Sequence, residues 1–158
     1  RRQRQMCIRD RPLCQRVLAS VSQARKSENE FIFECDRESM DMRTDTQRLQ
    51  QVIINLLSNA DKFTRNGKIT LGLKMDEKQR EVLFSVSDTG TGIPLEKQKL
   101  VFERFEKLNE YVQGTGLGLS ICKLTVEKWG GKIWVDPGYT DGARFVFTHP
   151  LDIEQPKK

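Results

Sequence analysis

The stretch 47–64, QRLQQVIINLLSNADKFT, constrains the fold of this chain more than any other part of the sequence. Helical geometry, at about 100° per residue, gathers its apolar side chains on one broad face. The members of that face are Leu49, Val52, Ile53, Leu56, Leu57 and Ala60. A second face beside it carries Asn55, Asn59, Lys62 and Phe63. The first face predicts a helix that packs on a hydrophobic core.

The second face is unusual for a core-facing helix, because it places two amides, an ammonium group and an aromatic ring side by side. Asparagine is a poor helix former, and packing alone gives no reason for two of them one turn apart. Two interpretations stay open at this point. Asn55 and Asn59 are solvated surface residues, or they form one wall of a binding site. The other motifs bear on that choice.

The elements around this helix predict an α+β fold. Asp45 or Thr46 is the expected N-cap, and a left-handed turn over 65–67 ends the helix. Helical spacing of apolar residues predicts further helices over 13–21 and 117–129. Strands are predicted at 31–35, 40–44, 68–75, 80–87, 133–135 and 144–148. This order favours a two-layer α/β sandwich with a mixed, mostly antiparallel sheet and helices on one face.

Composition narrows the class of protein. The 158 residues suit one domain with its own core. The net charge of +5 would suit a nucleic-acid binder. However, the basic residues are spread along the chain without interleaved aromatic rings, so we expect no direct nucleic-acid partner. The cysteines lack zinc-site spacing, which indicates a reducing, cytoplasmic compartment. No run reaches the ~18 to 20 apolar residues of a membrane span.

The stretch 88–93, DTGTGI, follows directly on a predicted strand. A carboxylate at a strand end can accept hydrogen bonds from a flat ligand such as adenine. Glycines at alternate positions let the backbone approach such a ligand without a Cβ in the way. The alternative is a tight turn with a surface Asp88, because a pattern this short is only moderately specific.

A second glycine run, GTGLGL at 114–119, leads into the predicted helix over 117–129. Exposed amides and the helix dipole at that position suit phosphates. No lysine follows these glycines, which excludes a P-loop, and GLGLSI at 116–121 lacks the third glycine of the dinucleotide fingerprint. The alternative is a flexible hinge before a helix.

Between these two motifs, the stretch 101–107, VFERFEK, combines two aromatic rings with alternating charges. By itself it is typical of the end of an amphipathic helix. Pro94 is well placed to open that helix, since proline is favoured at the first helical position.

Taken in order, these four stretches resemble the N, G1, F and G2 boxes of the catalytic and ATP-binding domain of sensor histidine kinases. That domain shares a nucleotide-binding fold, the Bergerat fold, with gyrases, heat-shock chaperones and mismatch-repair ATPases. The match covers roughly 31–151. The segment FERFEKLNEYVQGTGLGLSICK is most similar to kinases of the hybrid two-component type.

The resemblance implies ATP and Mg²⁺ as ligands. Asn59 corresponds to the Mg²⁺ ligand, and Asp88 to the carboxylate that accepts the adenine amino group. Three positions correspond to catalytic residues: Asn55 as the polar partner of Asn59, and Lys62 and Lys107 as phosphate contacts. The other implied nucleotide-binding positions are Phe63, Gly90, Gly92, Ile93, Phe102, Phe105, Gly114, Thr115, Gly116, Leu117 and Gly118. The stretch 93–116 corresponds to the ATP lid.

One position separates branches of this superfamily. Its hydrolysing members carry a glutamate where this chain has Asn55, and that glutamate activates water. An amide cannot act as a general base. The resemblance therefore implies a kinase that passes phosphate to a partner.

The single histidine, His149, lies at the end of the last predicted strand and has no helical context. We interpret it as structural, so the acceptor histidine is expected on a dimerisation domain outside this chain. A response regulator receiver is the expected downstream partner. The isolated domain is expected to bind ATP and ADP as a monomer, and to be the cytoplasmic kinase portion of a membrane-anchored sensor.

The expected domain boundaries follow from the same reading. Residues 1–12 are predicted to be disordered or the remnant of a preceding dimerisation hairpin, 13–152 the catalytic and ATP-binding domain, and 153–158 a tail. An alternative function remains open, which is a nucleotide-binding regulatory module without phosphotransfer.

Overall fold

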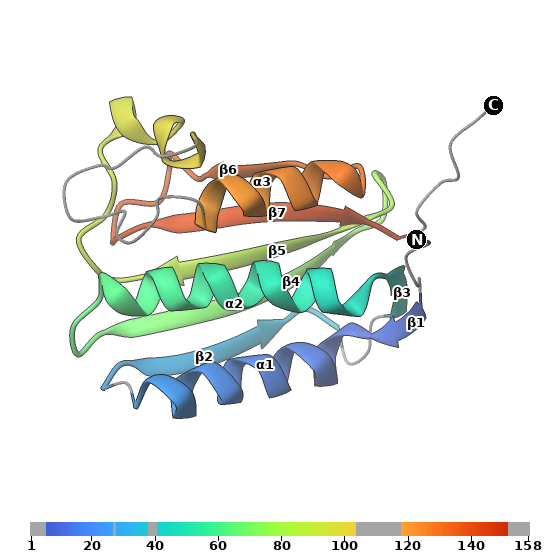
Figure 1. Cartoon of the computed structure of the whole chain (residues 1–158), viewed down its shortest axis with the longest axis horizontal. Helices are drawn as coiled ribbons and strands as arrows, with labels where there is room; N and C mark the ends of the chain where they lie inside the picture. Colours follow the sequence, from blue (N-terminus) through green and yellow to red (C-terminus); the bar gives the residue numbers. More distant parts are fainter. Residues whose placement is uncertain (1–5, 27, 38–40, 104–117, 152–158) are drawn as a thin grey trace.

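A computed structural model describes residues 6–26, 28–37, 41–103 and 118–151. In these ranges, three α-helices cover one face of a five-stranded sheet (Figure 1). The helices are α1 (Asp10–Arg25), α2 (Thr46–Lys62) and α3 (Gly118–Lys128). The sheet contains β2 (Glu30–Cys35), β4 (Lys68–Asp76), β5 (Glu81–Asp88), β6 (Ile133–Val135) and β7 (Arg144–Pro150). The two-layer architecture predicted from the sequence is confirmed.

The strand order is β2-β4-β5-β7-β6. Only the β2–β4 pair is parallel, and the other three pairs are antiparallel. Because β5 and β7 run antiparallel, Val82 lies opposite His149 while Ser87 lies opposite Arg144. The last residues of β5 and the last residues of β7 therefore lie at opposite ends of the sheet.

Helix α2 packs its predicted apolar face on this sheet. All six residues named above for that face are buried. Asp45 is the N-cap, and its carboxylate accepts a hydrogen bond from the Arg48 amide. Asn66 takes the left-handed conformation after the helix, with a φ of 51°. The predicted start and end of this helix are thus confirmed.

Aromatic rings fill the core between the sheet and α3. Phe84 stacks on Phe147 from the neighbouring strand, with ring centroids 4.7 Å apart. Trp129, just after α3, tilts against both Phe147 and His149. These contacts anchor α3 to β7 through large buried surfaces.

The segment before α1 is more ordered than its sequence suggests. A strand β1 (Met6–Arg9) pairs antiparallel with β3 (Asp41–Thr44), and α1 already begins at Asp10. Of the two alternatives predicted for 1–12, disorder therefore does not hold for residues 6–12, and the remnant of a preceding hairpin stays a prediction. Strand pairing with a distant segment leaves no periodic signal in such a short stretch.

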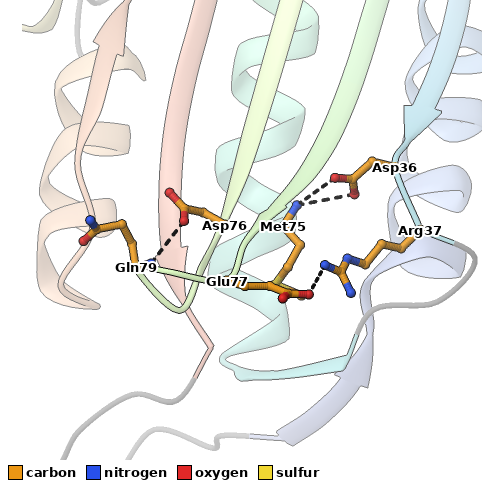
Figure 2. Close-up of polar contacts among 6 residues, drawn as sticks. All are labelled: Asp36, Arg37, Met75, Asp76, Glu77 and Gln79. Atoms are coloured by element: carbon orange, nitrogen blue, oxygen red, sulfur yellow. Dashed lines mark hydrogen bonds and ion pairs between the residues drawn. The ribbon is translucent and has the colours of Figure 1, made fainter.

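The hairpin between β4 and β5 marks one end of the sheet, called here the hairpin end (residues 35–37, 75–82 and 149). Figure 2 shows the polar contacts that tie this hairpin to the end of β2. Both carboxylate oxygens of Asp36 lie 3.4 Å from the Met75 amide, and Arg37 pairs with Glu77. The opposite end, called the Asp88 end, contains residues 61–67, 88–92, 118 and 136–143.

Candidate functional site

Helix α2 presents Asn55 and Asn59 one turn apart, and both side chains are half-buried. The Asn55 amide is held from two sides. Gln51 Nε2 donates to Asn55 Oδ1 at 3.0 Å, and Asn55 Nδ2 donates to the Cys122 Sγ of α3 at 3.6 Å. Burial raises the pKa of the Cys122 thiol to about 11, so this sulfur is a neutral acceptor. The interpretation of Asn55 and Asn59 as fully solvated surface residues is therefore wrong.

Lys62 and Phe63 close the helix. Lys62 is exposed in the last turn, where a cation interacts favourably with the helix dipole. Phe63 is the C-cap residue and packs partly against the core. Its carbonyl oxygen accepts a hydrogen bond from the Thr91 amide at 3.3 Å. The end of α2 is thereby joined directly to the loop after Asp88.

Asp88 is the last residue of β5, and its side chain is buried. The amides of Gly90 and Ala143 donate to the same oxygen, Oδ1, at 2.9 and 3.1 Å. Among the described residues, Oδ2 accepts no hydrogen bond. Burial raises the pKa of the Asp88 carboxyl above its ordinary value, and the two amide donors partly oppose that shift. The interpretation of Asp88 as a surface turn residue is therefore wrong.

Gly90 is required for a reason other than the predicted approach of a ligand. A Cβ at this position would lie 2.1 Å from the Phe63 carbonyl oxygen and 2.7 Å from Thr64 Oγ1. The close approach is thus between two segments of the protein itself. Gly92 has a φ of 75°, a conformation that glycine adopts at little cost.

Thr64 carries a buried hydroxyl that no sequence motif singled out. Its Oγ1 atom has no hydrogen-bond partner within the described part of the chain. Tyr139 is a second omission, since its hydroxyl donates to the Asp88 carbonyl at 2.8 Å and Arg144 stacks on its ring. Ala143 is a third. All three meet Asp88 or Gly90 only through tertiary contacts, and the sequence around 137–142 indicated only a turn.

The described part of the segment after Asp88, residues 89–103, departs from the predicted helix. It contains two short 3₁₀ segments, η1 (Leu95–Lys97) and η2 (Leu100–Phe102). Ile93 and Phe102 are buried, and Phe102 meets Phe145 edge to face. Gly118 is the first residue of α3. The predicted site residues Phe105, Lys107, Gly114, Thr115, Gly116 and Leu117 lie outside the described residues.

The Asp88 end offers groups that a polar ligand can use. Among the described residues, one oxygen of the buried Asp88 carboxylate accepts no hydrogen bond and the Thr64 hydroxyl beside Gly90 has no partner, so both suit a ligand that donates and accepts hydrogen bonds, as adenine does. Within the described ranges, no cluster of three or more His, Cys, Asp or Glu side chains is placed to hold a metal. A Mg²⁺ ion here would rely on amide oxygens and ligand phosphates, a pattern that Mg²⁺ accepts.

His149 belongs to the other end of the sheet and is completely buried. Its Nδ1 lies 2.6 Å from the Pro150 carbonyl, which can only accept, so Nδ1 carries the proton. Nε2 then accepts from the Thr44 hydroxyl at 2.8 Å. Burial lowers the pKa of His149 to about 4, against the raising effect of the Pro150 carbonyl. The structural interpretation of His149 agrees with this burial.

No helix among the described residues is both long and apolar enough to cross a membrane.

Comparisons with known proteins agree on one family. Residues 44–153 match the model of the histidine kinase-, DNA gyrase B- and HSP90-like ATPases. The adaptive-response sensory kinase SasA of Microcystis aeruginosa is 38% identical over 144 residues, which cover 88% of this chain and 37% of that protein. The chain thus spans little more than a third of this relative's length.

Two solved structures show the same fold. The nucleotide-free catalytic domain of the histidine kinase ThkA matches 96% of this chain and all of that domain, with a TM-score of 0.83 and 32% identity. ThkA in complex with the response regulator protein TrrA matches 92% of this chain and 42% of that chain, with a TM-score of 0.74 and 31% identity.

Proposed function

This chain belongs to the family of histidine kinase-, DNA gyrase B- and HSP90-like ATPases, and we propose that it is the ATP-binding catalytic domain of a sensor histidine kinase. It binds ATP with Mg²⁺ at the Asp88 end of the sheet. It then donates the γ-phosphate to a histidine on a dimerisation domain outside this chain. The similarity to SasA and to the ThkA catalytic domain supports this proposal.

One observation carries the assignment of the site. Within the described ranges, one oxygen of the buried Asp88 carboxylate accepts no hydrogen bond, and the Thr64 hydroxyl that lies against Gly90 has no partner. A buried hydroxyl without a partner costs stability until water or a ligand satisfies it, which supports a ligand at this place. Asp88 Oδ2 accepts from the adenine amino group in this proposal. The Thr64 hydroxyl, which lies against Gly90, pairs with the same base or with a water bound to it in this proposal.

The phosphates lie along the second face of α2. Asn59 provides an amide oxygen for Mg²⁺, and bound Mg²⁺ neutralises charge on the phosphates. Lys62 and Lys107 bring positive charge to the phosphate oxygens, and the amides at the start of α3 donate to them. These residues position and neutralise the phosphates, which is most of what phosphoryl transfer requires from a protein.

Asn55 favours transfer over hydrolysis. Its amide is oriented by Gln51 and Cys122, which fixes its position without giving it basicity. Asn55 therefore offers no general base to a water molecule bound beside it. We therefore infer that ATP persists in the site until an acceptor histidine arrives.

His149 is not that acceptor. It is buried, both of its ring nitrogens have partners, and it lies at the hairpin end, away from Asp88. The acceptor therefore belongs to a separate dimerisation domain, and this chain by itself is a monomer in the proposal. ThkA is known in complex with a response regulator protein, which supports a receiver domain as the next partner here. A cytoplasmic location follows from that role, and membrane anchoring of the parent protein rests on family resemblance alone.

Nucleotide binding is the first test. ADP is titrated into the wild-type chain with and without Mg²⁺, and then into Asn59→Ala and Asp88→Ala. We expect Asn59→Ala to lose the Mg²⁺-dependent part of the affinity, and Asp88→Ala to weaken binding in both conditions. Gln47→Ala, at an exposed position of the first turn of α2, is the matched control. Unchanged affinity in both site variants would contradict the site assignment.

Phosphotransfer needs a second test. Radiolabelled ATP is added to the chain alone and to the chain mixed with a separate histidine-bearing hairpin from a related kinase. Label on the hairpin alone is expected. Label on His149 would contradict its structural role. ADP binding without transfer to any of several hairpins would support a regulatory module instead of a kinase.

A further inference from the structure

Asn29, between α1 and β2, uses both ends of its amide to hold the chain just beyond α2. Its Nδ2 donates to Asp61 Oδ1 at 2.8 Å and to the Thr64 carbonyl at 2.9 Å. Its Oδ1 accepts from the Gly67 amide at 2.8 Å. Arg25, the last residue of α1, donates to the other Asp61 oxygen at 2.5 Å. One half-buried side chain therefore fixes three points of the segment 61–67.

This segment is the one that leads into the proposed nucleotide site. It contains Lys62 and Phe63, and it braces the loop after Asp88. The Phe63 carbonyl accepts from the Thr91 amide at 3.3 Å. The Lys68 amide donates to the Thr89 hydroxyl at 3.0 Å, and the Thr89 amide returns a bond to the Lys68 carbonyl at 3.2 Å. These bonds join the stretch 63–68 to the loop residues Thr89 and Thr91.

Thr64 connects the two sides most directly. Asn29 holds its carbonyl group, while its unpartnered hydroxyl lies 2.7 Å from the position that a Cβ of Gly90 would occupy. The bond from Asn29 is thus on the same residue as the hydroxyl that faces the proposed place of the base. Through this bond, the effect of Asn29 on the site acts by way of Thr64.

Packing does little to hold 61–67 on this side. A polar pocket opens beside the Asn29 bonds and is lined by Glu28, Asn29, Asp61, Thr64, Arg65 and Asn66. Where a pocket replaces packed side chains, the neighbouring segment loses van der Waals contacts on that side. After the last helical hydrogen bonds at Phe63 and Thr64, the bonds from Asn29 add to the backbone bonds of Phe63 with Thr91 and of Gly67 with Glu30 in holding the chain.

We propose that Asn29 is a positioning residue for the nucleotide site, which sets the place of Phe63 and Thr64 from outside the site through its bonds to Asp61, Thr64 and Gly67. This inference rests on the proposed ATP-binding function. It predicts that loss of the Asn29 amide weakens nucleotide binding by more than a comparable loss of stability elsewhere would.

The test compares Asn29→Ala with Thr44→Val, which removes a buried hydrogen bond at the hairpin end. Thermal midpoints and ADP affinities in the presence of Mg²⁺ are measured for both variants and wild type. We expect both variants to unfold at lower temperature, and only Asn29→Ala to bind ADP more weakly, on the order of tenfold. If Asn29→Ala does not fold, Asn29→Asp replaces it, because this variant keeps the oxygen that accepts from Gly67 and loses both donations.

The outcomes separate this inference from the proposed function. Wild type that binds ADP, together with a folded Asn29 variant whose affinity stays within about twofold of wild type, would overturn the role of Asn29 alone. An equal loss of affinity in Thr44→Val would also overturn it, since the effect would then follow general stability. Wild type that binds no ADP would overturn the proposed function, and this inference with it.

Discussion

The two ends of the sheet treat their buried polar groups differently. At the hairpin end, His149 is buried with a partner at each ring nitrogen, and polar contacts tie the β4–β5 turn to the end of β2 (Figure 2). At the Asp88 end, within the described residues, one oxygen of the buried Asp88 carboxylate accepts no hydrogen bond, and the buried Thr64 hydroxyl has no partner. Thr46, two residues after Thr44, carries a buried hydroxyl on the hairpin side that also has no partner in the described part of the chain.

The difference indicates what each end is built for. A buried polar group that is fully paired within the protein stabilises one conformation. One that stays unpaired costs stability until water or a ligand pairs it. In the proposed function, the His149 contacts serve folding and the Asp88 carboxylate serves the ligand. Substitutions that keep the shape of the side chain, made at each end, should separate an effect on stability from an effect on ADP affinity.

Asp88→Asn tests the difference most strongly. The amide keeps the shape of the side chain but removes the charge, and it places a donor where the base would donate. We expect ADP affinity to fall by about 100-fold, which corresponds to about 3 kcal/mol. Titration calorimetry measures the loss, with Asp141→Asn in the exposed nearby turn as control. Equal affinities in the two variants would refute the role of Asp88.

Acidification should weaken the hairpin end first. The pKa of His149 is lowered to about 4 in the folded chain, so the unfolded chain binds a proton at higher pH than the folded one. The stability that His149 contributes is therefore complete above its ordinary pKa of ~6.5 and is lost as pH falls towards 4. Between pH 7.5 and 5, the loss is about 2 kcal/mol.

Asp88 acts in the opposite direction. Its pKa is raised, so the stability linked to its protonation is present at low pH and lost as pH rises through the folded pKa. Urea unfolding at several pH values gives the free energy of unfolding as a function of pH. Compared with wild type, this free energy should rise less steeply with pH in His149→Gln and more steeply in Asp88→Asn. If the pH dependence of the free energy of unfolding is unchanged in His149→Gln, groups other than His149 cause the loss of stability in acid.

The same substitution, threonine to valine, should have opposite effects on stability at the two ends. Thr44→Val leaves His149 Nε2 buried without its donor, and we expect a loss of about 1 to 2 kcal/mol with unchanged ADP affinity. Thr64→Val removes an unpartnered buried hydroxyl, and we expect a gain of about 1 kcal/mol with weaker ADP binding. Denaturant midpoints and ADP titrations of both variants measure these effects. Two losses of stability would show that the Thr64 hydroxyl is already satisfied in solution.

The smallest effect is expected on the surface of the hairpin end. Arg37 pairs with Glu77, but both side chains are exposed, at 39% and 70%. An exposed ion pair contributes less than about 1 kcal/mol, because water and salt screen it. Arg37→Gln should shift the denaturant midpoint only slightly and leave ADP affinity unchanged. A larger loss would mean that this contact, rather than the buried His149, holds the hairpin end together.

Sequence periodicity predicted the scaffold of the site closely. The apolar face of α2 is buried as predicted, and the strands around Phe84 and Leu71 alternate as expected. The 3.6-residue and two-residue periods survive in these elements because each has one face on the core. Elements without one face on the core were not predicted correctly from periodicity. The strand Met6–Arg9 and the 3₁₀ segments after Pro94 carry no such period.

Motif order, rather than any one motif, led to the proposed site, and its residues stay a prediction. Asn55, Asn59, Lys62 and Phe63 share one end of one helix, so their proximity follows from local geometry. A structural need for Gly90 was also predicted from the sequence, but the prediction gave a different reason for it, the close approach of a ligand. Gly90 makes room for the Phe63 carbonyl, a contact between segments that are far apart in sequence.

The sequence by itself determined the fold class, the two faces of α2 and the family, because these depend on periods and short motifs within single elements. Only the tertiary structure decided which groups enclose Asp88 and which hold the end of α2. Ala143 and Tyr139 reach Asp88 from more than fifty positions away, and Asn29 reaches Asp61 across 32. Strand order and strand register bring such residues together, and a linear pattern does not record either one.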